Sequence, residues 1–119
     1  MISGDGVSRR RPSTSYSARL LGSKWNILII RELTGGPRRF SELQAALAGI
    51  SPRTLSDRLR WLKTEKVVSR TVYSEVPPRV EYALTVKGRA LGPVLTAMKD
   101  YERVWGPPDG PAAHPPGLE

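Results

Sequence analysis

Residues 51–64 read SPRTLSDRLRWLKT, and their apolar and polar positions separate cleanly on a helix. Leu55, Leu59 and Leu62 recur at i, i+4 and i+7, which places them on one helical face that we expect to be buried. The leading serine is a good N-cap, and the proline after it fits the first helical position, where its missing N–H removes no hydrogen bond. The pattern predicts a short amphipathic helix with a polar outer face.

The outer face of this predicted helix carries the chemical groups that read DNA. Arginine can bond guanine O6 and N7, hydroxyls can bond base edges or phosphates, and a carboxylate can accept from the cytosine amino group. The free N–H groups at the start of a helix also attract phosphate. The alternative is that these charges are simply solvated, as on most exposed helices. We expect the DNA contacts of this segment to come from Ser51, Arg53, Thr54, Ser56, Asp57 and Arg60.

The residues on either side of this segment predict the rest of a winged helix-turn-helix domain. Apolar residues at helical spacing indicate a helix that ends before Gly22 and another that is capped by Ser23. A third helix opens with a capping box of Ser41 and Gln44. Two runs of β-forming residues within 67–84 indicate a hairpin. The expected fold class is therefore α+β, mainly helical, with a two-stranded β wing.

The tip of the hairpin and the turn before the third helix carry further basic residues. Two prolines ending at Pro78 stiffen the tip and leave Arg79 at its end, which suits insertion into a narrow, electronegative minor groove. The alternative is a turn that merely needs prolines. Arg39 has two interpretations, as a phosphate contact or as a partner for a carboxylate such as Glu42. Outside 51–64, the expected DNA contacts are Arg38, Arg39, Ser41, Pro78 and Arg79.

A last helix is expected after the hairpin, capped by Thr85 and bent at Pro93, which removes one helical hydrogen bond. Its apolar residues form one stripe from Leu91 to Trp105, more than a domain of this size needs to close its own core. The stripe favours an interface with a second copy, although the helix could instead cover only its own domain. The residues that we expect at this interface are Tyr16, Leu20, Leu95, Met98, Tyr101 and Trp105.

Composition narrows the classes of function. The chain has 119 residues with 19 Lys and Arg against 11 Asp and Glu, a formal charge of +8 that favours an acidic partner such as DNA. It has no cysteine, and its one histidine, His114, lies in a stretch rich in proline and glycine, so we expect neither an enzyme nor a metal or other cofactor. No apolar run approaches the roughly 20 residues that span a bilayer, so we expect no membrane association and a cytoplasmic location.

We expect one folded domain between two flexible ends. Residues 1–14 mix Ser, Gly, Arg and Pro without apolar periodicity and predict a flexible basic arm. Residues 15–105 form the DNA-binding and dimerisation domain. Residues 106–119 are rich in proline and glycine and predict a disordered tail.

Three stretches of the chain closely resemble the HxlR family of bacterial, MarR-like winged helix-turn-helix regulators. They are GPRRFSEL at 36–43, GIS at 49–51 and EVPPRVEYALT at 75–85, and the resemblance spans about residues 16–105. It implies a homodimeric repressor or activator whose dimer is built from the terminal helices. The recognition helices would enter successive major grooves of a palindromic operator, and the wing tip would lie in the minor groove.

The sequence departs from the family pattern at three places. Many members carry a cysteine for thiol sensing about a dozen residues before the Lys-Trp pair at 24–25; here residues 12–13 are Pro-Ser, so that mechanism is not carried over. Lys66 stands where glycine is usual, and a left-handed lysine there would strain the turn by roughly 1 kcal/mol. Trp61 takes a usually polar position, and packing at the wing base, contact with DNA and lining of a pocket all stay open.

The main functional prediction is a sequence-specific, homodimeric transcriptional regulator. The alternative is a non-specific nucleic-acid binder or a winged-helix protein-interaction module, which the high positive charge would serve equally well. A small apolar effector is a further candidate partner. The aromatic residues that could line its pocket, or simply fill the core, are Trp25, Trp61, Tyr101 and Trp105.

Overall fold

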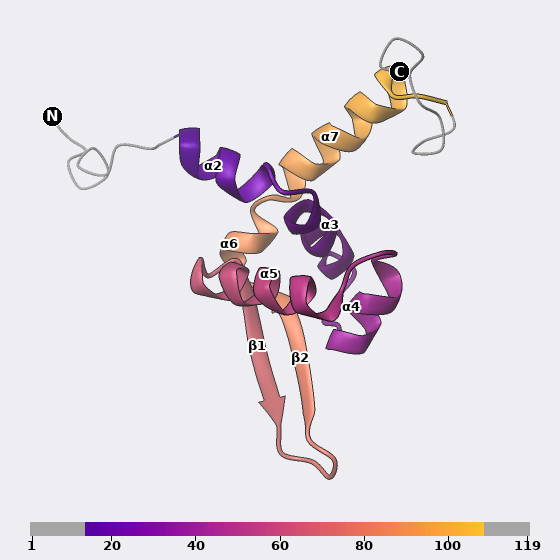
Figure 1. Cartoon of the computed structure of the whole chain (residues 1–119). Helices are drawn as coiled ribbons and strands as arrows, with labels where there is room; N and C mark the ends of the chain where they lie inside the picture. The colour runs from indigo at the N-terminus through magenta and orange to yellow at the C-terminus, as the bar shows by residue number, and fades with distance from the viewer. Residues whose placement is uncertain (1–13, 109–119) are drawn as a thin grey trace, which may run out of the picture.

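The computed structural model describes residues 14–108, which fold as a winged helix-turn-helix domain (Figure 1). Its elements are α2 (Thr14–Leu21), α3 (Lys24–Leu33), α4 (Phe40–Ala46), α5 (Pro52–Thr64), β1 (Val68–Tyr73), β2 (Arg79–Leu84), α6 (Val86–Arg89) and α7 (Gly92–Trp105). The expected α+β fold with a two-stranded wing is confirmed. The arm expected at 1–14 lies outside the described residues apart from Thr14, which begins α2, and so does the tail expected at 106–119 apart from 106–108.

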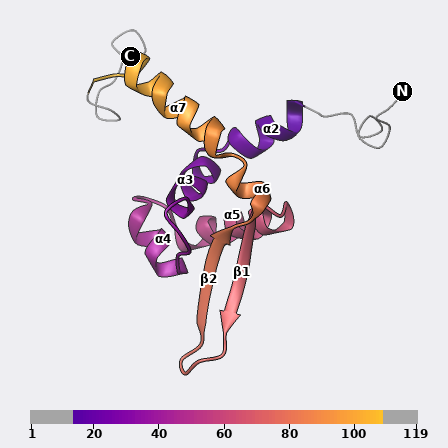
Figure 2. The same cartoon turned by 180° about the vertical axis from the view of Figure 1, so that it is seen from behind.

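The domain has two distinct ends. α3, α4 and α5 gather at the base of the β hairpin, which extends away from them as the wing, while α2 and α7 leave the body at the opposite end (Figures 1 and 2). β1 and β2 pair antiparallel, with Val68 opposite Leu84. Arg38 adds a short bridge to Tyr82 through two backbone hydrogen bonds of 2.9 and 2.8 Å. This bridge ties the start of α4 to the wing.

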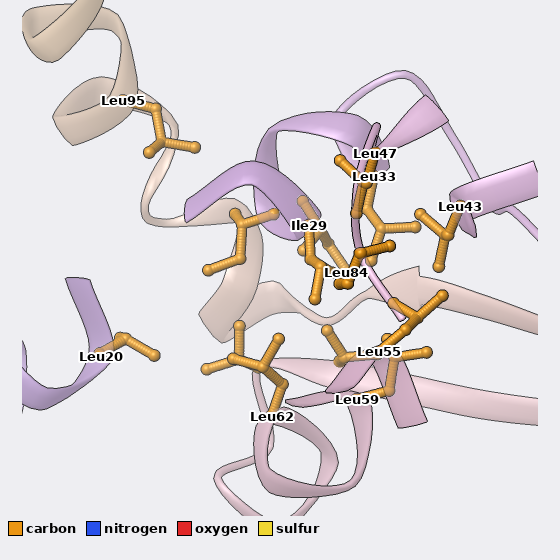
Figure 3. Close-up of a cluster of buried hydrophobic side chains, with 14 residues drawn as sticks. Leu20, Ile29, Leu33, Leu43, Leu47, Leu55, Leu59, Leu62, Leu84 and Leu95 are labelled. Carbon is orange, nitrogen blue, oxygen red and sulfur yellow. The ribbon is translucent and has the colours of Figure 1, made fainter. Parts of the chain in front are cut away.

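The hydrophobic core lies among the helices and the base of the wing (Figure 3). Leu55, Leu59 and Leu62 of α5 are 0%, 2% and 0% exposed, so the predicted inward face is confirmed. The other buried apolar residues are Leu20, Ile29, Ile30, Leu33, Leu43, Leu47, Ile50, Val67, Val68, Leu84 and Leu95. The buried side chain of Asn26 donates to the carbonyl of Leu20 at 3.1 Å and so joins α3 to α2.

Serine side chains set the start of two helices as predicted. Ser23 Oγ accepts the backbone N–H of Asn26 at 3.4 Å, at the start of α3. Ser51 Oγ accepts the backbone N–H of Thr54 at 3.1 Å, at the start of α5. In both cases the side chain satisfies a backbone donor that has no partner within the helix.

The start of α4 differs from the prediction. The prediction of a capping box at Ser41 and Gln44 is wrong, because α4 begins at Phe40 and its N-cap is Arg39. The backbone N–H of Arg39 donates to the Glu42 carboxylate at 2.8 Å. The preceding residue is held in the bridge to the wing, so the chain turns into a helix directly after that bridge. The helix therefore begins with a cap between Arg39 and Glu42, directly after the residue that is bridged to the wing.

α5 ends in a left-handed turn. Lys66 has φ +66°, a conformation that favours glycine, as anticipated from its position. The N–H of Lys66 donates to the carbonyl of Lys63 at 2.9 Å, and the N–H of Val67 donates to that of Leu62 at 2.9 Å. These are the two hydrogen bonds of a Schellman motif, and they lead the chain directly into the wing.

The expected single last helix is two helices. Thr85 caps α6, since its hydroxyl accepts the N–H of Gly88 at 3.1 Å, but α6 ends at Arg89 and α7 starts at Gly92. Pro93 accounts for a break where we expected a bend. In a continuous helix its ring would clash with the carbonyl of Arg89, whereas the first turn of a new helix tolerates it. The link between α6 and α7 therefore sets the direction of α7.

Candidate nucleic-acid interface

The outer face of α5 is exposed along its length. The side chains of Arg53 and Arg60 are 92% and 73% exposed, and that of Asp57 is 50% exposed. Thr64, at the end of the helix, is also exposed. The structure thus brings the predicted base-reading residues together on one surface, opposite the buried leucines.

Asp57 lies between the two arginines of this surface. Its Oδ2 is 4.0 Å from Arg53 Nε, and its Oδ1 is 3.6 Å from Arg60 Nη1. Exposed pairs of this kind stabilise a helix by only about 0.3–0.5 kcal/mol each. The pairs nevertheless place two guanidinium groups and a carboxylate side by side as one array on the exposed face. Such an array offers both donors and an acceptor to base edges.

The N-cap and first turns of α5 carry three hydroxyl groups. Ser51 is exposed and its Oγ also donates to Thr54 Oγ1 at 2.9 Å. Thr54 and Ser56 are half-buried. Because the helix dipole is positive at this end, the arrangement suits a phosphate more than a base.

The three predicted contacts around the start of α4 are placed differently from one another. The guanidinium of Arg38 donates to the carbonyl of Pro37 at 3.0 Å, which folds the side chain back onto its own turn. Arg39 and Ser41 are exposed. Glu42 accepts from the backbone N–H of Arg39, and within residues 14–108 the guanidinium of Arg39 has no ion-pair partner. Glu42, which the sequence suggested as a carboxylate partner of the Arg39 side chain, therefore caps the helix instead.

Arg79 is held by carboxylates at the start of β2. Its Nη1 is 2.7 Å from Glu81 Oε2, its Nη2 is 2.9 Å from Glu75 Oε2, and its guanidinium lies 4.1 Å from the centre of the Tyr73 ring. The hydrogen bond with Glu75, together with the charges of both glutamates, raises the pKa of Arg79 above its ordinary value despite partial desolvation. Arg79 is thus paired with two carboxylates within the protomer, and its contact with a minor groove stays a prediction.

The outermost part of the wing is apolar. Val76 is 101% exposed, and Pro77 and Pro78 beside it are also exposed. Apolar side chains of this kind contact sugars or wedge between base steps in proteins that use the minor groove. Pro78 is exposed beside Val76, and its contact with DNA stays a prediction.

Sequence reasoning missed two cationic residues, one in α5 and one in the wing. Lys63, in the last turn of the helix, and Arg70, in β1, line a polar cleft together with Arg60 and Ser56. Helical spacing of three residues from Arg60 was a signal for Lys63. Arg70 had no comparable signal, because only the packing of the wing shows which of its faces meets α5.

The residues expected at an interface between copies fall into two groups. Leu20 and Leu95 are each 4% exposed and belong to the protomer's own core, which corrects their assignment to an interface. Met98 and Tyr16 are half-buried against that core. Tyr101 and Trp105 are exposed on α7 and remain open to a partner.

The aromatic residues that the sequence suggested for an effector pocket do not gather within the protomer. Trp25 and Trp61 pack half-buried against the core, and Arg58 lies 5.8 Å from the Trp61 ring, so Trp61 serves packing at least in part. Tyr101 and Trp105 are exposed on α7. A mostly apolar cavity of about 420 Å³ lies elsewhere, between the end of α3, β2 and the α6–α7 link, and none of the residues that line it is aromatic.

Within residues 14–108, no three His, Cys, Asp or Glu side chains gather where they could hold a metal ion. In the same range, no helix has both the length and the apolar character that crossing a bilayer requires.

A helix-turn-helix with an exposed, arginine-bearing second helix, followed by a β wing, defines a DNA-binding regulator of the winged-helix class. The model of the HxlR-like helix-turn-helix family matches residues 20–109. The chain therefore belongs to that family of transcriptional regulators, and it is not an enzyme.

Relatives and solved structures agree with this assignment. The chain is 51% identical over 86 residues to an uncharacterized HTH-type transcriptional regulator of Synechocystis, sll1512, a match that covers 72% of this chain and 64% of the relative. It is similar to the reduced transcriptional regulator YodB from B. subtilis, with a TM-score of 0.73, 38% identity and coverage of 82% and 95%. It is also similar to the oxidized redox regulator HypR, with a TM-score of 0.72, 34% identity and coverage of 76% and 93%. These 119 residues contain no cysteine, so they offer no thiol for redox chemistry.

Proposed function

We propose that the protein binds a palindromic operator as a homodimer, with α5 in the major groove and the wing tip, residues 76–79, in the adjacent minor groove. The outer face of α5 carries the proposal, because Arg53, Asp57 and Arg60 are exposed together there. Family membership supplies the DNA-binding role. The exposed side chains supply the means to distinguish one base sequence from another. A regulator of this kind would act on the chromosome, so the proposal includes a cytoplasmic location in a bacterial cell.

An apolar stripe on α7 supports the homodimer. Its members recur at spacings of three and four residues, so they share one side of the helix, and all of them are exposed. They are Val94, Ala97, Tyr101, Val104 and Trp105. Exposed apolar surface of this kind marks an interaction site, and in a two-fold dimer the same stripe of a second copy covers it. The ion pair of Arg31 with Glu102, at 3.3 Å, holds α7 at a defined angle to α3.

The two-fold arrangement predicts the layout of the operator. Recognition helices that enter successive major grooves on one face of the duplex lie about 34 Å apart, one helical turn. The operator should therefore be a palindrome whose half-sites are centred roughly 10 base pairs apart. The wings would then reach the minor grooves that flank the two half-sites.

The test is binding to a selected operator against a scrambled duplex of equal length, by fluorescence anisotropy at physiological salt. Arg53→Ala and Arg60→Ala should each cost about 1–3 kcal/mol on the operator and much less on the scrambled duplex, because a bidentate base contact is lost. Lys99→Ala removes the same charge from an exposed position on α7 and serves as the control.

The outcomes separate the candidate functions. A wild-type protein that binds both duplexes equally would be a non-specific nucleic-acid binder. A protein that binds neither duplex would point to a protein-interaction module. If the wild type is specific but Arg53→Ala and Arg60→Ala keep its affinity and preference, α5 is not the recognition helix.

A further inference from the structure

The cleft between α5 and the wing is polar and positively charged. It has a volume of about 330 Å³ and is lined by Ser56, Leu59, Arg60 and Lys63 of α5 and by Arg70 and Tyr82 of the wing. Arg70 and Tyr82 stand opposite each other in the strand register, so their side chains lie on the same face of the wing. That face also bears the buried Val68, and it is the one turned toward α5.

Within residues 14–108, no acidic side chain inside this cleft balances its positive charge. Among the residues that the structure describes, no Asp or Glu lines the cleft. In that part of the chain, neither Lys63 nor Arg70 forms an ion pair, and both are exposed. Arg60 is the one lining cation with a described ion pair, to Asp57 at 3.6 Å on the outer face of the helix.

The opposite face of the wing is built differently. Strand alternation places Tyr73, Arg79 and Glu81 on that face, and Arg79 is already bound by Glu75 and Glu81. The polar cleft on this side, next to α4, is lined by three glutamates together with three arginines. Opposite charges therefore balance there, whereas the unbalanced cations of the wing lie on the side of α5.

We propose that the cleft between α5 and the wing holds one phosphate of the DNA backbone in each half-site, bound by Lys63 and Arg70. The inference rests on the proposed function: when α5 lies in a major groove and the wing in the neighbouring minor groove, one backbone strand must cross between them. The cleft is the space that this strand crosses.

The side chains that line the cleft match a phosphodiester. Arg70 supplies a planar guanidinium that can donate to two phosphate oxygens, and Lys63 supplies a compact charge. The hydroxyls of Ser56 and Tyr82 add neutral donors. Contacts to phosphate set the register and tilt of the recognition helix on the duplex, and they carry no base information of their own.

The salt dependence of binding tests this proposal. Lys63→Gln and Arg70→Gln should each bind operator and scrambled duplex about fivefold more weakly at 0.15 M salt, with the slope of log K against log salt reduced by about 0.9. The ratio between the two duplexes should be unchanged. Lys99→Gln, which removes an exposed charge on α7, should keep the wild-type slope.

Replacing single phosphates of the operator with uncharged analogues shows which phosphate the cleft contacts. When single phosphates of the operator are replaced in turn by methylphosphonates, the wild type should lose affinity at one backbone position per half-site that Arg70→Gln no longer senses. The proposal is overturned if both cleft variants keep the wild-type slope, or if they change the ratio of operator to scrambled binding. A different result would contradict the proposed function, namely a wild-type protein that does not prefer the operator over the scrambled duplex. Thermal melting by circular dichroism verifies that each variant is folded.

Discussion

Trp105→Ala should dissociate the dimer while leaving each protomer folded. Trp105 is 73% exposed at the end of the apolar stripe on α7, and it is not among the buried residues of the core. Truncation of its side chain therefore removes surface that only a partner can cover. If the stripe is the interface, the equilibrium between monomer and dimer should shift strongly and the melting of the isolated fold should not.

The magnitude follows from the exposed area. A tryptophan offers up to about 250 Å² to bury, so an exposure of 73% leaves roughly 180 Å² for a partner. At about 25 cal/mol per Å², complete burial would contribute about 4.5 kcal/mol, and burial of half that surface about 2 kcal/mol. Because a two-fold dimer contains the residue twice, the variant should lose about 4 kcal/mol, or roughly a thousandfold in the dimer Kd.

Sedimentation equilibrium over a dilution series measures this Kd. Val86→Ala is the matched control, because Val86 is a 75% exposed apolar residue of α6 that does not belong to the stripe. A dimer Kd for Trp105→Ala within tenfold of the wild type, or an equal loss with Val86→Ala, would refute the assignment of the stripe as the interface.

Three further predictions follow from the contacts of single residues. Gly88→Ala should lower stability by about 2–3 kcal/mol, because its Cβ would clash with the backbone carbonyl oxygen of Val67. Gly92→Ala is the control, because a Cβ at Gly92 meets nothing within 4 Å, and it should change stability by under about 0.5 kcal/mol. Equal melting temperatures for Gly88→Ala and Gly92→Ala, measured at one protein concentration, would contradict the reasoning. Lys66→Gly should raise the free energy of unfolding by about 1 kcal/mol in urea titrations, since φ is +66° there, and a loss of stability would show that the turn is not strained. Asp57→Asn should raise the affinity for scrambled DNA about fivefold, because a charge that repels phosphate is removed, and lower the ratio of operator to scrambled binding. An unchanged ratio would mean that Asp57 reads no base.

The helix α5 and its exposed face could be predicted from the sequence because their signals are local. A period of 3.6 residues brings leucines at i, i+4 and i+7 onto one face whatever surrounds the helix, and this alone exposes Arg53 and Arg60. The caps at Ser23 and Ser51 bond backbone donors three residues away, so their prediction needed no knowledge of the fold.

The start of α4 shows where local signals fail. Ser41 and Gln44 satisfy the pattern of a capping box, yet the helix begins earlier, at Phe40. The cap that forms is also local, from the Glu42 carboxylate to the backbone N–H of Arg39. It lies directly after the backbone bridge between Arg38 and Tyr82, which joins segments more than 40 residues apart and is invisible in the sequence.

The wing shows most clearly what the sequence determines and what only the tertiary structure decides. Alternation with a period of two residues puts Arg70 on the face of β1 opposite to Tyr73, and the register of the hairpin, which pairs Tyr73 with Arg79, then puts Arg79 on the face opposite to Arg70. Only the packing of the hairpin turns Arg70 toward α5, and only the folded tip brings Glu75 onto Arg79. Periodicity along the chain determines which side chains share a face, since helices and strands repeat at constant intervals. The tertiary structure decides what each face meets, since contacts between distant segments depend on how all the elements pack together.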